Sequence, residues 1–365
     1  MSATLGLGCY ILTAKANIFL VPEEPEAQIE VLKIPEEATK GADGKDVEDF
    51  EIICSTKEVA QSSMFAVGTS AKTCVIYHAK PGQLEVCRWF RVPKAPTSIV
   101  FDNRGNVVVG DRSGNVTQYR CTEAHMGRHE NDEDCKFEGS PLAGGVTMIL
   151  DVAFSADFKY LLTADRDEKI KVYRYPDCSA MYAVAFGHTE YVRSVDVYDR
   201  TVVSGGGDGR LYLHDLHDGT QLFTTNKLGE KPIRRLSIVE IEGFPNLFVT
   251  FEASPRLYVF GLTAKNNLEL KDAVEAQSPI VDFHVIADRN SILLLTRDGL
   301  DIYNPSDNTT IRRTSSELVE AVTTIAEELS LFKNVTHQNM QEYHERKAKK
   351  MANVAEKKAA VKIKS

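Results

Sequence analysis

The chain has 365 residues and a net charge of −9, with 43 Lys or Arg residues against 52 Asp or Glu residues. Its seven cysteines are scattered and unpaired in spacing, which argues against a disulfide framework and favours a reducing compartment. No apolar run reaches membrane-spanning length, and the short apolar run near the start lacks the basic residues of a signal peptide. We therefore do not expect a disulfide scaffold or a helical membrane protein.

Seven strand–turn–strand units recur along the chain. In order they lie at 10–21, 67–77, 109–119, 161–172, 204–213, 256–259 and 298–303. The second and third units lie 42 residues apart, a period typical of WD-type propeller blades. A four-stranded blade cannot bury both of its faces alone, so such units must stack around an axis. The period predicts an all-β fold, a seven-bladed WD40-type β-propeller over residues 1–303.

Two acidic insertions interrupt the period, at 22–49 and at 121–141. We expect the first to be a mobile surface loop, because it is acidic and almost free of aromatic residues. The second contains two cysteines and two histidines, Cys121, His125, His129 and Cys135. Four such ligands can bind zinc, but this insertion is dominated by carboxylates and lacks the apolar residues of a small metal module. We therefore predict no metal site.

The C-terminal segment, 304–365, is expected to form an amphipathic helix followed by a basic tail. The apolar residues of the helix follow a four–three spacing, at Leu318, Val322, Ile325, Leu329 and Phe332. This stripe either packs on the propeller or binds a partner protein. Residues 341–365 carry +5, leaving −14 for the rest, and an acidic body is by itself a poor nucleic-acid binder.

Four residues of the tail are candidates for RNA contact, namely Arg346, Lys347, Lys349 and Lys350. The same cluster is also compatible with a nuclear-import signal or with a solvated helix end.

The fifth unit carries the residues that brace a WD blade. In such blades a His from a Gly-His pair bonds the Asp of the hairpin turn, next to a Ser or Thr. His188, Ser204 and Asp208 fit this pattern, and Asp167 aligns with Asp208 in the fourth unit. The bracing network also explains the likeness of the first three to a hydrolytic triad. Motifs for a nucleophilic serine, a phosphate-binding loop or a zinc protease are absent from the sequence, so we predict no catalytic residue and no cofactor.

The turn of the fourth unit, Asp165-Arg166-Asp167-Glu168-Lys169, carries charges that the other turns lack. Arg166 aligns with Gly207, and Glu168 aligns with Gly209. Positions that accept glycine do not require Arg or Glu for folding, so these side chains are expected to project into solvent as interaction residues.

Two motifs together resemble one WD-repeat family. Ala-Asp-Arg-Asp-Glu-Lys-Ile at 164–170 is followed 17 residues later by Gly-His-Thr-Glu-Tyr-Val at 187–192. The stretch 151–215 is similar to the non-catalytic subunit of the eukaryotic tRNA (guanine-N7)-methyltransferase. The resemblance implies a nuclear scaffold that forms a heterodimer with a Rossmann-fold catalytic subunit, through the side of blades four and five. That complex methylates N7 of a guanosine in the tRNA variable loop.

Carried onto this chain, the resemblance implies a set of partner-binding residues: Arg166, Glu168, Lys169, Glu190 and Tyr191. A general WD scaffold, such as a substrate receptor of a ubiquitin ligase, remains the alternative. Those receptors commonly carry a Trp-Asp-x-Arg ending on a blade, which this sequence lacks.

Overall fold

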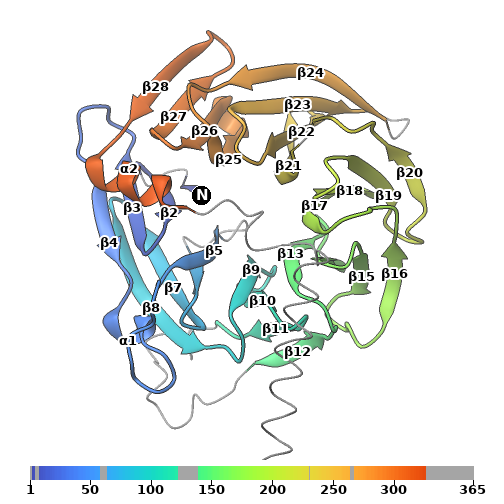
Figure 1. Ribbon diagram of the computed structural model, residues 1–365, viewed down its shortest axis with the longest axis horizontal. Coiled ribbons are helices and arrows are strands. Elements are labelled where there is room, and N and C mark those ends of the chain that lie inside the picture. The colour runs from blue at the N-terminus through green and yellow to red at the C-terminus, as the bar shows by residue number, and fades with distance from the viewer. Residues whose placement is uncertain are drawn as a thin grey trace, which may run out of the picture. The chain divides into compact units, whose positions relative to one another are not determined.

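The computed structural model describes residues 8–57, 64–121, 139–229, 231–263 and 267–325, together with the backbone of residues 2–4. The strands of this part form seven antiparallel four-stranded sheets arranged in a ring (Figure 1). The prediction of a seven-bladed β-propeller is confirmed. Among the described residues, no helix is long and apolar enough to cross a membrane.

Each blade consists of four consecutive strands, a to d from the centre outward. Blade one contains β1 (Ser2–Thr4), β2 (Cys9–Ala14), β3 (Asn17–Pro22) and β4 (Glu30–Lys33). Blade two contains β5 (Ile52–Lys57), β6 (Met64–Thr69), β7 (Thr73–Lys80) and β8 (Gln83–Arg91). Blade three contains β9 (Pro96–Phe101), β10 (Val107–Asp111), β11 (Val116–Tyr119) and β12 (Ser140–Ala143). Blade four contains β13 (Ile149–Phe154), β14 (Tyr160–Asp165), β15 (Ile170–Arg174) and β16 (Met181–Ala185).

The remaining blades follow the same order. Blade five contains β17 (Val192–Tyr198), β18 (Thr201–Gly206), β19 (Leu211–Asp215) and β20 (Gln221–Thr224). Blade six contains β21 (Ile233–Ile241), β22 (Phe244–Phe251), β23 (Arg256–Leu262) and β24 (Leu268–Glu275). Blade seven contains β25 (Ile280–Ile286), β26 (Ser291–Thr296), β27 (Gly299–Asn304) and β28 (Thr309–Arg313). The helical segments are α1 (Glu36–Thr39), a short 3-10 turn η3 (Ala287–Arg289) and α2 (Ser316–Thr323).

The hydrophobic core lies between neighbouring blades. Strand β6 is buried along its whole length, whereas the outer strand β24 is exposed at most positions. Leu162 and Val172 of blade four, for example, pack in one cluster with Val195 and Val202 of blade five. Middle strands are covered on both faces by adjacent blades, so they read as continuous apolar runs rather than as strict alternation.

The ring closes between blade one and blade seven, and α2 covers the seam (Figure 1). Each of the two blades is built from its own consecutive strands, so no strand is exchanged across the closure. Leu318 and Val322 of α2 are fully buried in a cluster that includes Phe19 of β3 and Leu300 of β27. The Ser315 hydroxyl caps α2 by accepting the Leu318 N–H at 3.2 Å. Of the two interpretations of the apolar stripe, packing on the propeller therefore holds for its described part.

Two expectations about the chain's divisions need correction. The propeller does not end at 303, because β28 and α2 belong to the compact unit that extends to Ile325. The segment 22–49 is not a simple loop, because it contains β4, the outer strand of blade one, and also α1. The acidic composition concealed these short elements. Most of the insertion 121–141, at residues 122–138, lies outside the described residues, as do Leu329 and Phe332.

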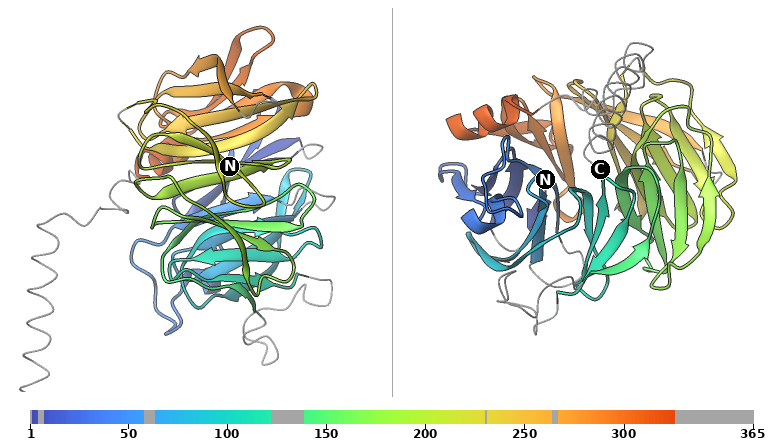
Figure 2. Two further views of the ribbon diagram at one scale, coloured as in Figure 1. Left: turned by 90° about the vertical axis from the view of Figure 1, so that its right-hand side faces the viewer. Right: turned by 60° about the horizontal axis from the view of Figure 1, so that its bottom comes forward.

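The ring has two faces, which the side views show (Figure 2). We call the face formed by the b–c turns and the d–a connections between blades the b–c face, and the opposite one the a–b face. On the b–c face of blades two to seven, each turn is tied by a backbone hydrogen bond to the connection that enters its own blade. In blade four the Arg166 N–H donates to the Met148 carbonyl at 3.0 Å, and in blade five the Gly207 N–H donates to Tyr191 at 2.9 Å.

Candidate functional site

The b–c turn of blade four is held from beneath by Asp165. This carboxylate is 1% exposed, and one oxygen accepts the N–H groups of Asp167 at 2.9 Å and Lys169 at 3.1 Å. Its other oxygen lies 3.0 Å from the Lys171 ammonium. Asp111 holds the turn of blade three in the same way, accepting the Ser113 N–H at 2.7 Å. The shape of the turn therefore depends on Asp165 and the backbone, not on its exposed charges.

The charged side chains of this turn lie at the surface of the b–c face. Arg166 is about half exposed, and its Nε lies 3.9 Å from Asp167, a surface contact of little energetic value. Lys169 donates to the Asp167 carbonyl at 3.0 Å. Glu168 has a positive φ of 71°, where Gly209 of blade five has 68°. A non-glycine residue in this conformation costs about 1 kcal/mol or more, so folding does not favour Glu168 here.

In blade five the expected bracing residues lie in contact. His188 Nδ1 is 3.0 Å from Asp208 Oδ2, and its Nε2 is 2.9 Å from the Ser204 hydroxyl. Burial alone would raise the pKa of Asp208, but the hydrogen bond and charge of His188 hold that pKa below its ordinary value. Blade four differs from the expectation, because Asp167 is exposed and reaches no histidine. The connection before β13 has Gly145 where His188 stands in blade five, so Asp165 holds that turn instead.

Replacing Asp208 by Asn is expected to lower the free energy of unfolding by about 1–3 kcal/mol at neutral pH. Because the folded pKa lies below the ordinary 3.8, the carboxylate stabilises the fold above that value and loses its effect as pH falls through the folded pKa. The difference from wild type should therefore shrink below about pH 4 in urea unfolding experiments. Asp167→Asn, the aligned change in blade four, is the matched control and should be nearly neutral. An equal loss in both variants would contradict this account.

Two further candidates, Glu190 and Tyr191, lie in the connection that enters blade five. Glu190 is half-buried, but Tyr191 is only 5% exposed and cannot present its ring to a partner. Both side chains lie over Gly207, where a Cβ atom would stand 2.6 Å from the Glu190 carboxylate and 2.7 Å from the Tyr191 ring. The absence of a side chain at Gly207 thus makes room for Tyr191. Tyr191 is therefore buried against Gly207 instead of being exposed at the surface, and its part in partner binding stays a prediction.

Two exposed apolar residues flank the charged turn, and sequence reasoning missed both. Val146 is 97% exposed in the connection before β13, and Phe186 is 60% exposed in the connection after β16. The Phe186 carbonyl is held by His214 Nε2 at 2.9 Å, while its ring faces solvent. Both residues lie outside any strand, so alternation could not assign them. The available signal was a large apolar residue beside glycines, at Gly145-Val146 and Phe186-Gly187.

Charged residues on the inner strands link neighbouring blades. Asp151 of β13 accepts a backbone N–H of β17 at 3.0 Å, and Asp196 of β17 accepts a backbone N–H of β21 at 2.7 Å. Arg235 and Asp282 form an ion pair between β21 and β25 at 2.5 Å. Burial raises the pKa of Asp196 to about 6. The sequence showed no ring of charge here, because bulges near the start of these strands break the alternation.

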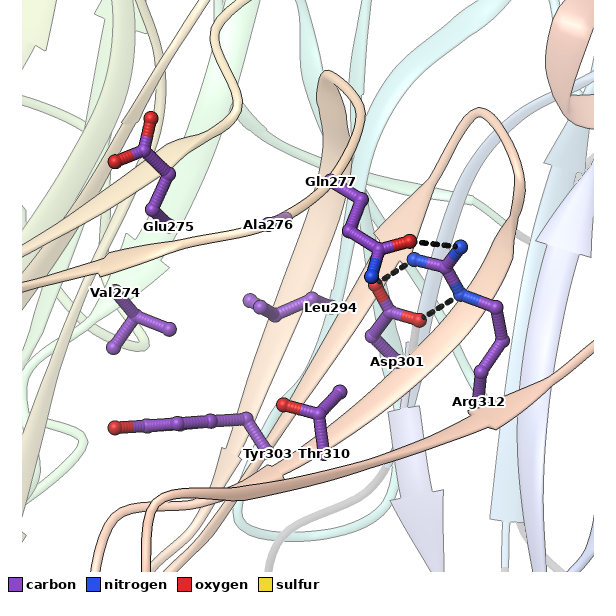
Figure 3. Close-up of a pocket in the computed structure, with 9 residues that line it drawn as sticks. All are labelled: Val274, Glu275, Ala276, Gln277, Leu294, Asp301, Tyr303, Thr310 and Arg312. Atoms are coloured by element: carbon purple, nitrogen blue, oxygen red, sulfur yellow. Dashed lines mark hydrogen bonds and ion pairs between the residues drawn. The ribbon is translucent and has the colours of Figure 1, made fainter.

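A small pocket of about 220 Å³ lies between the outer strands of blades six and seven (Figure 3). Its polar wall is Arg312, which donates to the buried Asp301 at 2.6 and 2.7 Å and to Gln277 at 2.9 Å. The lining residues are Val274, Glu275, Ala276, Gln277, Leu294, Asp301, Tyr303, Thr310 and Arg312. Arg312 and Asp301 face each other across β27 and β28, so we interpret the pair as a link between strands. None of the predicted site residues lines this pocket.

Fold and turns together define a WD-repeat β-propeller with an exposed charged turn on blade four. The family of the tRNA methyltransferase TRM82 WD40 domain matches residues 115–325, which is more than half of the chain. The chain belongs to this family. The family assignment expected from the motifs at 164–170 and 187–192 is thereby confirmed.

Relatives in this family are named as non-catalytic subunits. A Caenorhabditis elegans protein named tRNA (guanine-N(7)-)-methyltransferase non-catalytic subunit is 34% identical over 279 residues, covering 73% of this chain and 66% of that protein. Proteins of the same name are 29% identical in Dictyostelium discoideum (61% of this chain, 52% of the relative) and 33% identical in Homo sapiens (44% and 37%). The chain thus spans less than two thirds of the length of these relatives. The prediction that this is not itself an enzyme agrees with these names.

Solved structures share the fold. A chain in the crystal structure of the mitotic checkpoint complex superposes with a TM-score of 0.62 at 13% identity, covering 85% of both chains. The computationally designed Ika8 protein reaches a TM-score of 0.53 at 15% identity, covering 83% of this chain and 85% of Ika8. At such identities the likeness concerns the propeller alone.

Proposed function

We propose that this chain is the non-catalytic subunit of a tRNA (guanine-N7)-methyltransferase. It binds and stabilises the catalytic subunit, and the complex forms N7-methylguanosine in the tRNA variable loop. The observation that carries the proposal is the turn 165–169, where a chain of this family exposes charges that its fold does not require. The names of the relatives support the same role.

The geometry of the turn suits a protein interface. Arg166 and Lys169 flank the two carboxylates Asp167 and Glu168, so a complementary surface would be held in one register. The exposed Val146 lies in a connection beside this turn and, with Phe186, supplies the apolar contact that interface centres require. Asp165 fixes the turn in advance, which lowers the ordering cost of binding. Phe186 and Val146 are therefore our candidates for apolar anchors of this interface.

The propeller would act as a rigid clamp on its partner. A subunit that binds only the folded catalytic subunit stabilises that subunit by mass action. We expect the partner to have a Rossmann-type fold and to carry the methyl-transfer chemistry, in a heterodimer. A nuclear location is also proposed, on the basic tail and the family likeness. Its residues Arg346, Lys347, Lys349 and Lys350 lie outside the described residues, and RNA contact by them remains a proposal.

Affinity purification of the full chain from its own cell extract, followed by mass spectrometry, tests the function. We expect a stoichiometric methyltransferase subunit, and we expect that subunit to form N7-methylguanosine in tRNA only when this chain is present. Methyl transfer of equal rate without this chain would contradict the proposal. Recovery of a cullin adaptor complex instead would favour the ubiquitin-ligase alternative.

A further inference from the structure

The pattern Arg-Arg-x-Ser occurs twice in the chain, as Arg234-Arg235-Leu236-Ser237 and as Arg312-Arg313-Thr314-Ser315. Two arginines placed two and three residues before a serine are the substrate pattern of basophilic protein kinases, which bind the guanidinium groups through carboxylates. Such a kinase holds its substrate in an extended conformation. Whether either serine can be modified therefore depends on where the fold places each copy of the pattern.

The fold removes the first copy from reach. Ser237 lies in β21, the innermost strand of blade six, whose backbone pairs with β22 from end to end. Both arginines of this copy form ion pairs inside the ring. Arg234 lies 2.9 Å from Glu252, and Arg235 lies 2.5 Å from Asp282. A kinase could bind this strand only after blade six unfolds.

The second copy lies at the outer rim of the propeller. It begins in β28, the outermost strand of blade seven, and in the described part of the chain no strand pairs with the outer edge of β28. Arg312, Thr314 and Ser316 are exposed, and Ser315 itself is half-buried. Only the end of one edge strand has to move for a kinase to bind this copy.

The arginine next to this site is held in the seam between blades one and seven. Arg313 is 5% exposed and donates to the carbonyls of Glu24 and Ala27 in blade one. Arg312 is more accessible, although its guanidinium binds Asp301 at 2.6 and 2.7 Å. A kinase that reads both arginines must draw Arg313 out of the seam, so modification depends on local opening of the ring at this point.

A phosphate on Ser315 would act on the helix that covers the seam. The Ser315 hydroxyl already caps α2 by accepting the Leu318 N–H at 3.2 Å. A phosphate keeps this acceptor role and adds negative charge, which the N-terminal end of a helix stabilises. Its oxygens would also lie beside the cations Arg312 and Arg313. Glu317 in the first turn is exposed, so solvent and salt screen its repulsion.

We propose that Ser315 is a phosphorylation site for a basophilic protein kinase, and that the phosphate strengthens the closure of the ring. The Ser315 oxygen bonds to the γ-phosphorus of ATP, the bond from that phosphorus to the β,γ-bridging oxygen breaks, and ADP leaves. The hydroxyl proton passes to a carboxylate base of the kinase. The site depends on the fold of this chain and not on the identity of its catalytic partner.

Incubation of the purified full-length chain with ATP and a kinase that selects Arg-Arg-x-Ser tests the site. Synthetic peptides of residues 231–243 and 308–320 give the rates of the two serines outside the fold, and mass spectrometry assigns the phosphate. Relative to its peptide, we expect Ser315 in the chain to react at least about a hundredfold faster than Ser237, which needs global unfolding. Equal relative rates would overturn the proposal, and so would an unmodified Ser315 in a chain whose 308–320 peptide is modified.

Two helix variants test the link to the seam. Leu318→Ala removes a buried contact of α2 and should speed the modification of Ser315 severalfold, because local opening becomes more frequent. Glu320→Ala, at an exposed position of the same helix, should react like wild type. Equal rates in the two variants would contradict a site controlled by the seam.

Amide hydrogen exchange tests the effect of the phosphate on the ring. Exchange in α2 of the phosphorylated chain should be slower by about twofold to fivefold than in chain incubated without ATP, the usual effect of a charge at a helix N-terminus. Ser315→Ala incubated with kinase and ATP should show no such slowing, because it lacks the acceptor hydroxyl. Unchanged or faster exchange in α2 after phosphorylation of Ser315 would overturn the proposed strengthening of the closure.

Discussion

Replacing Arg166 by Glu is expected to abolish the complex with the catalytic subunit while leaving the propeller folded. Arg166 is about half exposed, and within the described part of the chain its side chain makes one distant contact, to Asp167, so the fold loses little. At an interface the change removes a guanidinium and places a like charge against the partner's carboxylates. We expect affinity to fall by at least about a hundredfold, because a lost charge pair at such an interface costs several kcal/mol.

Two measurements make this prediction specific. Lys159→Glu has the same charge change on the same blade but on the a–b face, so it should co-purify the catalytic subunit like wild type. Thermal unfolding of both variants should match wild type. Wild-type co-purification of Arg166→Glu would remove the turn of blade four from the interface. Equal losses in both variants would indicate a long-range charge effect instead.

The repeats predicted the architecture because each blade is a local unit. Val116 and Ile170 begin equivalent strands, β11 and β15, and a polar turn precedes each of those strands, so periodicity alone located the blades. The bracing contacts of His188 could be expected for the same reason, since its partner Asp208 lies 20 residues away in the adjacent blade. It could not be expected that Asp165, and not Asp167, holds the turn of blade four. Which carboxylate is buried depends on whether the neighbouring connection supplies a histidine.

Other features depend on contacts between distant segments. Tyr191 is buried because Gly207 has no side chain, and neither residue by itself indicates this. Single cations such as Lys94 and Lys227 are far apart in sequence and share the b–c face only in the closed ring. Composition averaged them with the acidic segment that precedes blade two. Exposure of Phe186 likewise follows from the path of one connection, which periodicity does not describe.

Leu318→Ala is expected to destabilise the ring at its closure. The side chain is fully buried among residues of β2, β3 and β27, so its truncation should lower the free energy of unfolding by about 2–5 kcal/mol. The effect is large because this ring has no exchanged strand at its seam. Besides the packing of blade against blade, the seam is crossed by α2 and by Arg313, which donates to the carbonyls of Glu24 and Ala27.

Loss of buried contacts at the seam should increase local opening there, in addition to lowering the free energy of global unfolding. Amide hydrogen exchange should accelerate first in β2 and β27, because local opening begins where buried contacts have been lost. Exchange in β14 and β15 of blade four should remain close to wild type at low denaturant, and so should co-purification of the catalytic subunit. Glu320→Ala changes an exposed residue of the same helix and serves as the control, with an expected effect within about 0.5 kcal/mol. A uniform rise in exchange across all blades would contradict a closure held by α2, since it would mean that the ring opens as one unit.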